Sequence, residues 1–455
     1  LCKLLNKKSL IKRLERGLTP SKKMGTIVAC STPFGSSGIA VIRLSGSASH
    51  KIVSSFLKNP LITKKNNTPT LCQLVDSDGQ IFDEAIINFL FSPNTYTGED
   101  LVEISVHGNP IIIQKTIGLC CSFGAVIAPG GEFTKRAYLN NKLDMSQAES
   151  VASLISSKSL LGAKLSYKNL RGSLLENILS IKNKIIGTIG QIEFNLDISE
   201  EDLQPSLIPD SVSVIGSCIK NLSSAVESFE AVSVLTSGAS VVIAGPTNAG
   251  KSTLFNALLK KDRAIVSEVA GTTRDVLENT INIGEIPFVL KDTAGIRKTK
   301  DQIEKIGVEK SNQEVLLADL VLYLGEPGSV LSSDNPNVVY VFNKKDIRSG
   351  GEKYDISISA LKNKNISKLK KLILQRVSSG FSDIGFIVTS QRQVSCLKKT
   401  IHHLSIATKS LQQSPELELV AEDLNFALSF LDEITKKTTK DDVLDSVFSS
   451  FCVGK

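Results

Sequence analysis

The feature that most constrains this chain is an eight-residue stretch, Gly245 to Ser252, that reads Gly-Pro-Thr-Asn-Ala-Gly-Lys-Ser. An apolar run typical of a buried strand precedes it, at 240–244, and a helix-forming run follows, at 253–259. A glycine-rich loop between a strand and a helix closes backbone N–H groups around phosphates, and the helix N-terminus adds a favourable field. We expect Lys251 to reach the β- and γ-phosphates of a nucleotide and Ser252 to bind Mg²⁺.

A second phosphate-side motif follows forty residues after Ser252, where the apolar run 286–291 leads into Asp292-Thr-Ala-Gly295. A strand in this position delivers the Asp292 carboxylate to the surroundings of the metal ion. The backbone amide of Gly295 can then sense the γ-phosphate. The spacing therefore predicts a site that distinguishes nucleoside triphosphates from diphosphates.

The chain also carries two motifs that read the base. The apolar run 338–342 leads into Asn343-Lys-Lys-Asp346, and Ser359-Ala-Leu361 follows another short strand. A carboxylate at Asp346 can accept from the N1–H and 2-amino groups of guanine, which adenine does not offer, and Asn343 can serve the O6/N7 edge. Backbone amides at 359–361 can meet the guanine O6. The four motifs in this order predict binding of GTP rather than ATP.

The residue after Gly295 bears on hydrolysis. In Ras-like enzymes a Gln there positions the attacking water, and here it is Ile296, which cannot. Another group is required, and Asp301 and Glu304 are the nearest acidic residues downstream. The loop 265–275 supplies a switch threonine for Mg²⁺ and several carbonyls that can seat a monovalent cation in place of an arginine finger.

Hydrophobic periodicity divides the rest of the chain. Segment 25–140 contains short β-branched runs bounded by turn residues, which predicts an α+β domain; the runs are 39–44, 85–91 and 101–106. Apolar residues spaced by three and four predict amphipathic helices over 174–192, 212–229 and 417–434. Helical segments thus lie on both sides of the nucleotide-binding motifs. We expect an α/β P-loop (Ras-like) domain inserted into an all-α domain.

Charge is unevenly placed along the chain. The net charge is +7, but residues 1–23 hold eight basic side chains and one acidic one, which leaves 45 basic and 45 acidic residues elsewhere. Any nucleic-acid binding by the body must therefore come from a local patch or from a partner. The segment 1–23 is either an organelle presequence or membrane-surface helix, or a disordered extension before a domain that starts near Met24. We favour the extension.

Two further features exclude other classes of protein. No apolar run approaches the ~18 residues that a membrane span needs, so we expect no integral membrane protein. The eight cysteines show neither a Cys-x-x-Cys pair nor metal-ligand spacing, so we expect reduced thiols.

Several stretches outside the nucleotide motifs carry a family resemblance. They are Thr26 to Ala29, Gly38 to Gly46, Tyr96 to Gly108, Pro129 to Asp144, Ala270 to Asp275 and Phe451-Cys-Val-Gly-Lys455. Together with the nucleotide motifs, they make the chain resemble the MnmE/TrmE family of tRNA-modification GTPases over residues 24–455.

The resemblance implies a fold and a ligand for the N-terminal domain. It would have the folate-binding fold of aminomethyltransferases and would bind 5,10-methylene- or 5-formyl-tetrahydrofolate through Arg43, Glu103, Lys142 and Lys455. Arginine and lysine suit acidic or carbonyl groups, and a glutamate can accept from a pterin amide and amine. Without that context, a strand-edge Arg, a surface Glu and solvated lysines are the alternatives.

The resemblance also assigns catalytic roles. K⁺ would be bound by Asn248, Ser267, Val269 and Thr272, and Mg²⁺ by Ser252 and Thr273. Glu304 would position water, and Cys452 would take part in the modification chemistry, with an exposed thiol on a mobile tail as the alternative. The nucleotide-binding residues expected from motifs and resemblance are Asn248, Ala249, Gly250, Lys251, Ser252, Thr253, Ser267, Glu268, Val269, Ala270, Gly271, Thr272, Thr273, Asp292, Thr293, Ala294, Gly295, Asn343, Lys344, Asp346, Ser359, Ala360 and Leu361.

The domains expected on this basis are a disordered basic leader at 1–23, a folate-binding and dimerisation domain at 24–140, a helical domain at 141–235 and 381–455, and a GTPase domain at 236–380. The resemblance further implies a homodimer and a flavoprotein partner that supplies FAD and NADH chemistry in a heterotetramer-type complex. The substrate would be the wobble uridine of certain tRNAs, which would receive an aminomethyl or carboxymethylaminomethyl group at C5. We expect a cytoplasmic protein without a membrane partner, in preference to a mitochondrial one.

Two rival functions remain open from the sequence. One is a regulatory GTPase of ribosome or membrane processes with an inert N-terminal domain. The other is a folate-dependent aminomethyltransferase that works without GTP. Folate binding that is lost in Arg43→Ala separates the first rival from a tRNA-modifying enzyme.

Overall fold

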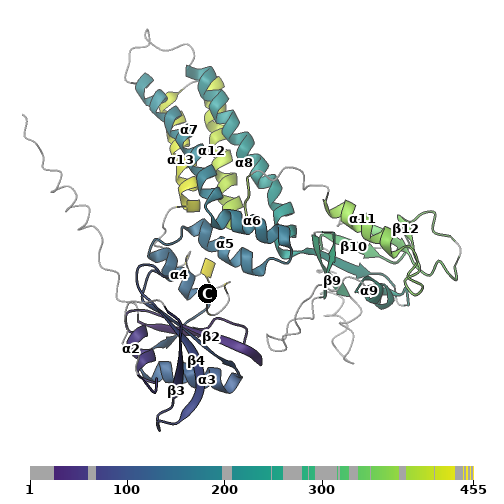
Figure 1. The fold of residues 1–455 in the computed structure, drawn as a ribbon. Helices are drawn as coiled ribbons and strands as arrows, with labels where there is room; N and C mark the ends of the chain where they lie inside the picture. Colours follow the sequence, from purple (N-terminus) through teal and green to yellow (C-terminus); the bar gives the residue numbers. More distant parts are fainter. Residues whose placement is uncertain are drawn as a thin grey trace, which may run out of the picture. The chain divides into compact units, whose positions relative to one another are not determined.

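The computed structural model describes residues 25–59, 68–196, 207–246, 248–259, 279–284, 286–292, 315, 318–326, 337–348, 350–378, 386–413, 416–435, 444, 447–448, 451 and 454. The basic leader expected at 1–23 lies outside these residues. The described chain forms two compact units. The first contains the residues up to 143 and those from 439 onward, and the second contains most of the chain from 144 to 438 (Figure 1).

A six-stranded sheet organises the first unit, in the order β3-β4-β5-β2-β1-β6. Its strands are β1 (Ile27–Cys30), β2 (Ser37–Ser45), β3 (Thr70–Val75), β4 (Ile81–Leu90), β5 (Leu101–Gly108) and β6 (Val126–Ile127), and its helices are α2 (Ser49–Ser54), α3 (Pro110–Ser122) and α4 (Glu132–Leu139). Neighbouring strands are antiparallel except for β1 and β6, which are parallel. The predicted runs 39–44 and 101–106 are confirmed within β2 and β5, and the run 85–91 is confirmed in β4 except for its last residue.

The two faces of this sheet are covered differently, because successive side chains of a strand point to opposite sides. Val28 and Ile42 belong to the core that α2 and α3 complete on one face. Ile27 and Ala29 point the other way and pack with Phe133 of α4. The α+β fold expected for the N-terminal part is confirmed.

Residues from the far end of the chain belong to the same unit. The ring of Phe448 lies 6.2 Å from that of Tyr138 in α4 and 5.3 Å from that of Phe451. Gly131 has a φ of +72°, and a Cβ there would lie 2.6 Å from the Phe448 carbonyl oxygen. The backbone of the C-terminal segment therefore lies directly against the N-terminus of α4.

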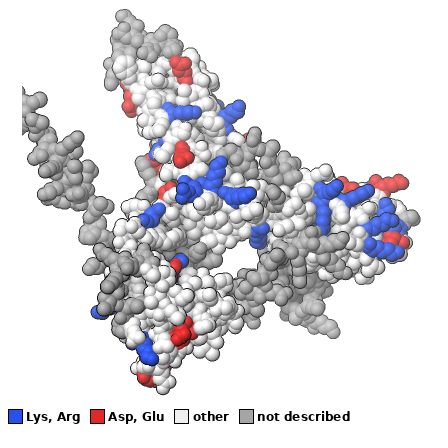
Figure 2. Space-filling model, in the orientation of Figure 1, with Lys and Arg blue, Asp and Glu red and all other residues white. Residues whose placement is uncertain are grey.

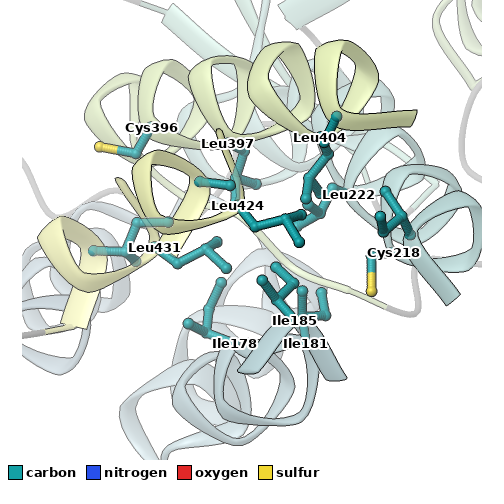
Figure 3. Close-up of a cluster of buried hydrophobic side chains, with 14 of the residues drawn as sticks. Ile178, Ile181, Ile185, Cys218, Leu222, Cys396, Leu397, Leu404, Leu424 and Leu431 are labelled. Atoms are coloured by element: carbon teal, nitrogen blue, oxygen red, sulfur yellow. The ribbon is translucent and has the colours of Figure 1, made fainter. Parts of the chain in front are cut away.

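Six helices of the second unit come from two separate parts of the sequence. They are α5 (Met145–Ser156), α6 (Leu160–Leu170), α7 (Ser173–Leu196), α8 (Leu207–Ser237), α12 (Gln391–Gln413) and α13 (Leu417–Thr435). The predicted apolar stripes are confirmed in α7, α8 and α13. Ile185, Leu222, Leu397 and Leu424 meet in one buried cluster (Figure 3). The two halves of the helical part therefore share a single core.

A buried ion pair also joins these two halves. Glu149 of α5 receives two hydrogen bonds from Arg392 of α12, Nε to Oε1 at 2.8 Å and Nη2 to Oε2 at 3.0 Å. Gln393 adds a third at 2.6 Å, and Arg392 also donates to the Glu433 carbonyl at 2.7 Å, near the end of α13. Every charge in this cluster is hydrogen-bonded, which is the condition for burying it at tolerable cost.

A second six-stranded sheet lies between the helical halves in sequence, in the order β12-β11-β10-β7-β9-β8. Its elements are β7 (Ala239–Ala244), α9 (Lys251–Leu259), β8 (Asn279–Ile283), β9 (Ile286–Asp292), β10 (Leu320–Tyr323), β11 (Val338–Phe342), β12 (Ile356–Ser357) and α11 (Ile366–Ser378). All neighbours are parallel except β8 and β9. The predicted P-loop α/β fold inserted into a helical domain is confirmed.

The first junction between helix and sheet is one residue long. Helix α8 ends at Ser237 and β7 begins at Ala239, with Gly238 between them at a φ of +87°. The Gly238 N–H donates to the Val234 carbonyl at 2.9 Å, which caps the helix end. A left-handed glycine thus turns the chain directly from the helix into the central strand.

None of the described helices is long and apolar enough to cross a membrane. The cysteines that the structure describes are free, at 30, 72, 120, 121, 218 and 396. Burial raises the pKa of Cys120 to about 12, so this thiol stays protonated near neutral pH. Its environment is that of a packed core residue and not of a nucleophile.

The close contact of α6 with α8 yields a test of the helical packing. Gly162 of α6 is buried, and a Cβ there would lie 2.3 Å from the Leu235 carbonyl oxygen. Gly162→Ala should therefore lower the free energy of unfolding by about 1–3 kcal/mol. Gly190→Ala is the matched control, because Gly190 is exposed in α7 with nothing within 4 Å of its would-be Cβ, and it should stabilise by about 0.5–1 kcal/mol.

Urea unfolding followed by circular dichroism measures both variants. The two glycine substitutions should move the midpoint in opposite directions. An unchanged or raised midpoint for Gly162→Ala would show that α6 and α8 are not in this contact.

Candidate functional site

The loop between β7 and α9 has the backbone that the sequence predicts for a phosphate loop. Gly245 has a φ of +141°, Asn248 of 64° and Gly250 of +93°. A Cβ at Gly250 would lie 2.4 Å from the Asn343 Nδ2 atom, and one at Gly245 would lie 3.1 Å from the Leu324 backbone nitrogen. Glycine is therefore needed at both ends of the loop, for conformation and for space.

Lys251 is the first residue of α9, and its side chain folds back over this loop. Its Nζ donates to the Gly245 carbonyl at 2.8 Å and to the Pro246 carbonyl at 2.9 Å. The ammonium group is thereby held within the curve of the loop, beside the N-terminus of α9. A positive charge and unsatisfied helix N–H groups in one place form a site for anionic phosphate.

Asn343 connects three segments of the site. Its Nδ2 donates to the Ala249 carbonyl at 3.0 Å, and its Oδ1 accepts from the Ala360 N–H at 3.1 Å. The next residue, Lys344, has a φ of 65° and donates from Nζ to the Asn248 carbonyl at 2.8 Å. The end of β11 is thus tied both to the phosphate loop and to the loop that follows β12.

Asp346 is held as a charged acceptor. The Ser359 hydroxyl donates to its carboxylate, which lowers the pKa of Asp346 below its ordinary value, and the Asp346 backbone N–H and the charge of Lys362 act in the same direction. The Lys362 Nζ lies 4.0 Å from Oδ2. The Lys345 N–H donates to the Ile358 carbonyl at 3.0 Å, which fixes the two loops in register.

A cavity of about 180 Å³ lies between these loops and the end of β11. Its walls include Asn248 and Ala249 of the phosphate loop, Asn343 and Lys344 after β11, and the Tyr354 ring. Four of the residues that line the cavity, Asn248, Ala249, Asn343 and Lys344, are among those that the sequence assigns to nucleotide binding. Leucine 361, the last residue of the base motif, is 79% exposed.

The structure describes only some of the other predicted site residues. Ser252 and Thr253 lie in the first turn of α9, and Asp292 ends β9 in register with Ile243 of β7. The remaining predicted residues lie outside the described residues: Ser267, Glu268, Val269, Ala270, Gly271, Thr272, Thr273, Thr293, Ala294, Gly295, Glu304, Cys452 and Lys455.

In the first unit, the structure brings two of the four predicted folate ligands together. Arg43 of β2 and Glu103 of β5 are directly opposite each other on neighbouring strands. Arg43 donates to Glu103 Oε1 from Nε at 3.0 Å and from Nη2 at 2.7 Å. Lys142 is placed differently, because its Nζ donates to the Pro93 carbonyl at 3.0 Å.

The C-terminal segment completes this site through its backbone. The Gly454 carbonyl accepts from Arg43 Nη1 at 3.5 Å and from the Ser31 hydroxyl at 3.1 Å. Gly454 has a φ of +89°, and a Cβ there would lie 2.5 Å from the Cys30 carbonyl oxygen. A residue near the end of the sequence, between Phe451 and Lys455, therefore lies beside Arg43.

Sequence reasoning missed three residues around this ion pair. Asn88 of β4 is in register with Glu103, and its buried Oδ1 has no hydrogen-bond partner among the described residues. The Phe133 ring lies 5.9 Å from the Arg43 guanidinium carbon, and Tyr96 bonds to Thr134 at 2.9 Å. Burial raises the pKa of Tyr96, so its hydroxyl stays neutral. Asn88 could have been identified only from the register of the strands, which is not evident from the sequence alone.

The comparisons with known proteins agree with this arrangement. The family model described as GTP-binding protein TrmE N-terminus matches residues 26–142, and the one described as MnmE helical domain matches residues 145–452. The protein named tRNA modification GTPase MnmE from Aquifex aeolicus (strain VF5) is 37% identical over 94% of this chain and 99% of its own length.

Two further relatives bear the same name. The protein from Thermotoga petrophila is 36% identical over 95% of this chain and 100% of its own length. That from Thermotoga maritima matches with the same identity and the same coverage. Two family models and relatives of nearly equal length agree with the motifs and with the fold, and the chain belongs to the MnmE family.

Proposed function

We propose that this protein binds and hydrolyses GTP and that it works in the modification of tRNA. The observation that carries the proposal is the double hydrogen bonding of Asn343, which joins the phosphate loop at Ala249 to the base loop at Ala360. The loop proposed to bind the phosphates and the loop proposed to bind the base are thereby held together. The relatives named tRNA modification GTPase MnmE support the second part of the proposal.

Base selection rests on Asp346. The ionised carboxylate accepts from the N1–H and 2-amino groups of guanine, while adenine presents no donor pair at these positions. The Ser359 hydroxyl donates to the carboxylate and lowers the pKa of Asp346. The Ala360 N–H donates to Asn343, and we propose that the neighbouring Leu361 N–H donates to the guanine O6.

Phosphate binding rests on the loop 245–252 and on Lys251. The donors available to the phosphates are the loop N–H groups and the ammonium group, and Ser252 and Thr273 carry hydroxyls suited to Mg²⁺. Asn248, Ser267, Val269 and Thr272 offer oxygen atoms of the kind that holds K⁺. When bound, the two cations neutralise the negative charge that develops as the γ-phosphate bond breaks.

Glu304 is the proposed water-positioning residue. Ile296 stands where Ras-like enzymes use a glutamine, so the chain needs a carboxylate from elsewhere to orient the water. Oriented water attacks in line while the Lys251 ammonium stabilises the leaving phosphate oxygens.

The Arg43–Glu103 pair is the centre of a proposed tetrahydrofolate site. The described contacts of Glu103 all use Oε1, which leaves Oε2 to accept from a pterin amide and amine. Arg43, Lys142 and Lys455 supply cations for the acidic and carbonyl groups of 5,10-methylene- or 5-formyl-tetrahydrofolate. The one-carbon unit would become the methylene group added to C5 of the wobble uridine.

The partners of the proposed reaction follow the family. They are a second copy of this chain, a flavoprotein that supplies FAD and NADH chemistry, and tRNA, in the cytoplasm. Cys452 is proposed to take part in the modification chemistry. We keep the proposed domains at 24–140, 141–235 with 381–455, and 236–380 as units for experiments on separate functions.

Replacing Asp346 with Asn tests base recognition. Asp346→Asn should lower the affinity for GDP at least tenfold, since a charge-assisted bond to N1–H is lost. It should raise the affinity for xanthosine diphosphate, because the Asn amide can donate to the 2-oxo group that replaces the 2-amino group. Titration of both nucleotides into both proteins gives the affinities, and Lys362→Gln should leave GDP binding nearly unchanged.

The same nucleotide affinities can be measured as a function of pH. The pKa of Asp346 is lowered, so the carboxylate is ionised at every pH above its ordinary range, and the ratio of GDP affinity to ADP affinity should be constant from pH 8 down to pH 5. The ratio cancels the titration of the terminal phosphate, whose second pKa is about 6 in both nucleotides. Equal affinity for guanosine and adenosine diphosphates would refute the assignment of this site.

Measurements of GTP turnover test both the proposed K⁺ site and the proposed water-positioning role of Glu304. Hydrolysis should be at least tenfold faster in K⁺ than in Na⁺, because a site that replaces the hydration shell with several protein oxygens can favour the larger ion. Glu304→Ala should abolish turnover while GDP affinity stays intact. Asp301→Ala is the matched control and should keep its turnover. Equal rates in the two salts would reject the cation site, and loss only in Asp301→Ala would move the water-positioning role there.

Arg43→Ala tests the folate site and separates the rival functions. It should lower the affinity for 5-formyl-tetrahydrofolate at least tenfold, because a half-buried cation and its bonds are removed. Arg43→Lys keeps the charge but loses the planar fork, so it should recover only part of the affinity. Circular dichroism and GDP titration check that each variant is folded. No folate binding by the unmodified protein would favour a regulatory GTPase with an inert first unit.

A further inference from the structure

One face of α6 is basic and takes no part in the sites described above. Lys164, Tyr167, Lys168 and Arg171 are all exposed, with Tyr167 at 52%. At 100° per residue, these positions fall within about 100° of one another around the helix axis. The side chains therefore form a single strip, the α6 strip, with an aromatic ring among three cations.

The opposite face of α6 is held firmly by its neighbours. The Ser159 hydroxyl accepts from the Gly162 N–H at 2.9 Å and donates to the Leu235 carbonyl at 2.6 Å. Ser166 bonds to Ser153 of α5 at 2.9 Å, and Asn169 donates to the Ile387 carbonyl at 3.1 Å. The strip is thus presented by a helix whose orientation is fixed within the helical core.

The stretch of sequence that contains the α6 strip holds no acidic residue between Glu149 and Glu176. The charged residues in this stretch are Lys158, Lys164, Lys168 and Arg171. The preceding acid, Glu149, is occupied by the buried pair with Arg392. Lys and Arg side chains gather on the surface near the α6 label of Figure 1, as Figure 2 shows. This is a local positive patch on a body whose overall charge is balanced.

Helix stability alone does not explain the strip. Cations in the last turn, such as Lys168 and Arg171, favour the helix C-terminus. Lys164 is in the middle of the helix, and Tyr167 carries no charge. No ion pair is formed by the three cations with other residues that the structure describes. Their charges are directed to solvent.

We propose that the α6 strip binds the phosphate backbone of tRNA, an inference that rests on the proposed function for its choice of RNA. Three cations over about 10 Å of helix match a line of phosphates, and an exposed ring can stack on an unpaired base. A lipid surface fits less well, since a helix lying in a membrane inserts a broad apolar face. The exposed face of α6 carries a single aliphatic side chain, Leu160, while Leu161 and Leu165 pack against a core.

The test compares full-length variants in binding of unfractionated bacterial tRNA across a range of KCl concentrations. K164Q/K168Q/R171Q should weaken binding tenfold or more at about 0.1 M salt and reduce the slope of log affinity against log salt by about 3. The matched control K220Q/K398Q/K409Q removes the same charge from exposed lysines of α8 and α12, and it should bind nearly as the unmodified protein does.

Tyr167 separates stacking from charge. Tyr167→Ala should weaken binding several-fold with no change in the salt slope, and Tyr167→Phe should retain the affinity because the ring is kept. GTP turnover of every variant should equal that of the unmodified protein, which shows that folding and the nucleotide site are intact.

The possible results distinguish a failure of the α6 strip proposal from a failure of the proposed function on which it rests. Equal loss in the two triple variants would overturn the α6 strip, because bulk charge would then account for binding. No tRNA binding by the unmodified protein would overturn the strip together with tRNA as a direct partner. Binding of anionic vesicles in place of tRNA, abolished by the same three substitutions, would replace RNA with a membrane as the ligand.

Discussion

The packing of helices from two distant parts of the sequence is the constraint on which the second unit depends. Leu222 of α8, Leu397 of α12 and Leu424 of α13 share one buried cluster. Burial of this apolar surface brings the chain back to the helices that it left, so the α/β part is necessarily an insertion. The same core fixes both junctions, since Gly238 follows α8 directly and Ile387 accepts a hydrogen bond from Asn169.

The inserted sheet gives the nucleotide site its precision. Parallel strands end at one edge, where short loops with few alternative conformations bring polar groups together. Asn343 ties the phosphate loop to the base loop, and Ser359 holds Asp346 in its charged form. A fixed negative group for the base and a fixed positive group, Lys251, for the phosphates are what a guanine nucleotide requires at its two ends.

In the first unit, the Arg43 side chain is only 17% exposed, so its charge needs partners within the protein. Glu103 neutralises Arg43 across two strands, and the Gly454 carbonyl and the Phe133 ring cover the rest of the guanidinium. The surroundings of Arg43 therefore include a residue from the far end of the chain. The α6 strip belongs to neither site and is attached to the helical core, where its cations do not compete with either ligand.

The sequence by itself determined what depends on near neighbours in the chain. Apolar residues spaced by three and four marked α7, α8 and α13, and the motifs placed Lys251, Asn343 and Asp346 at loops, because helical period and loop chemistry are local properties. The tertiary structure alone decided that Asn343 bonds to two loops, that Gly454 lies against Arg43, and that the face of α6 with the cations is exposed. Each of these depends on the path of the chain through a packed core, and burial of apolar surface, not residue order, sets that path.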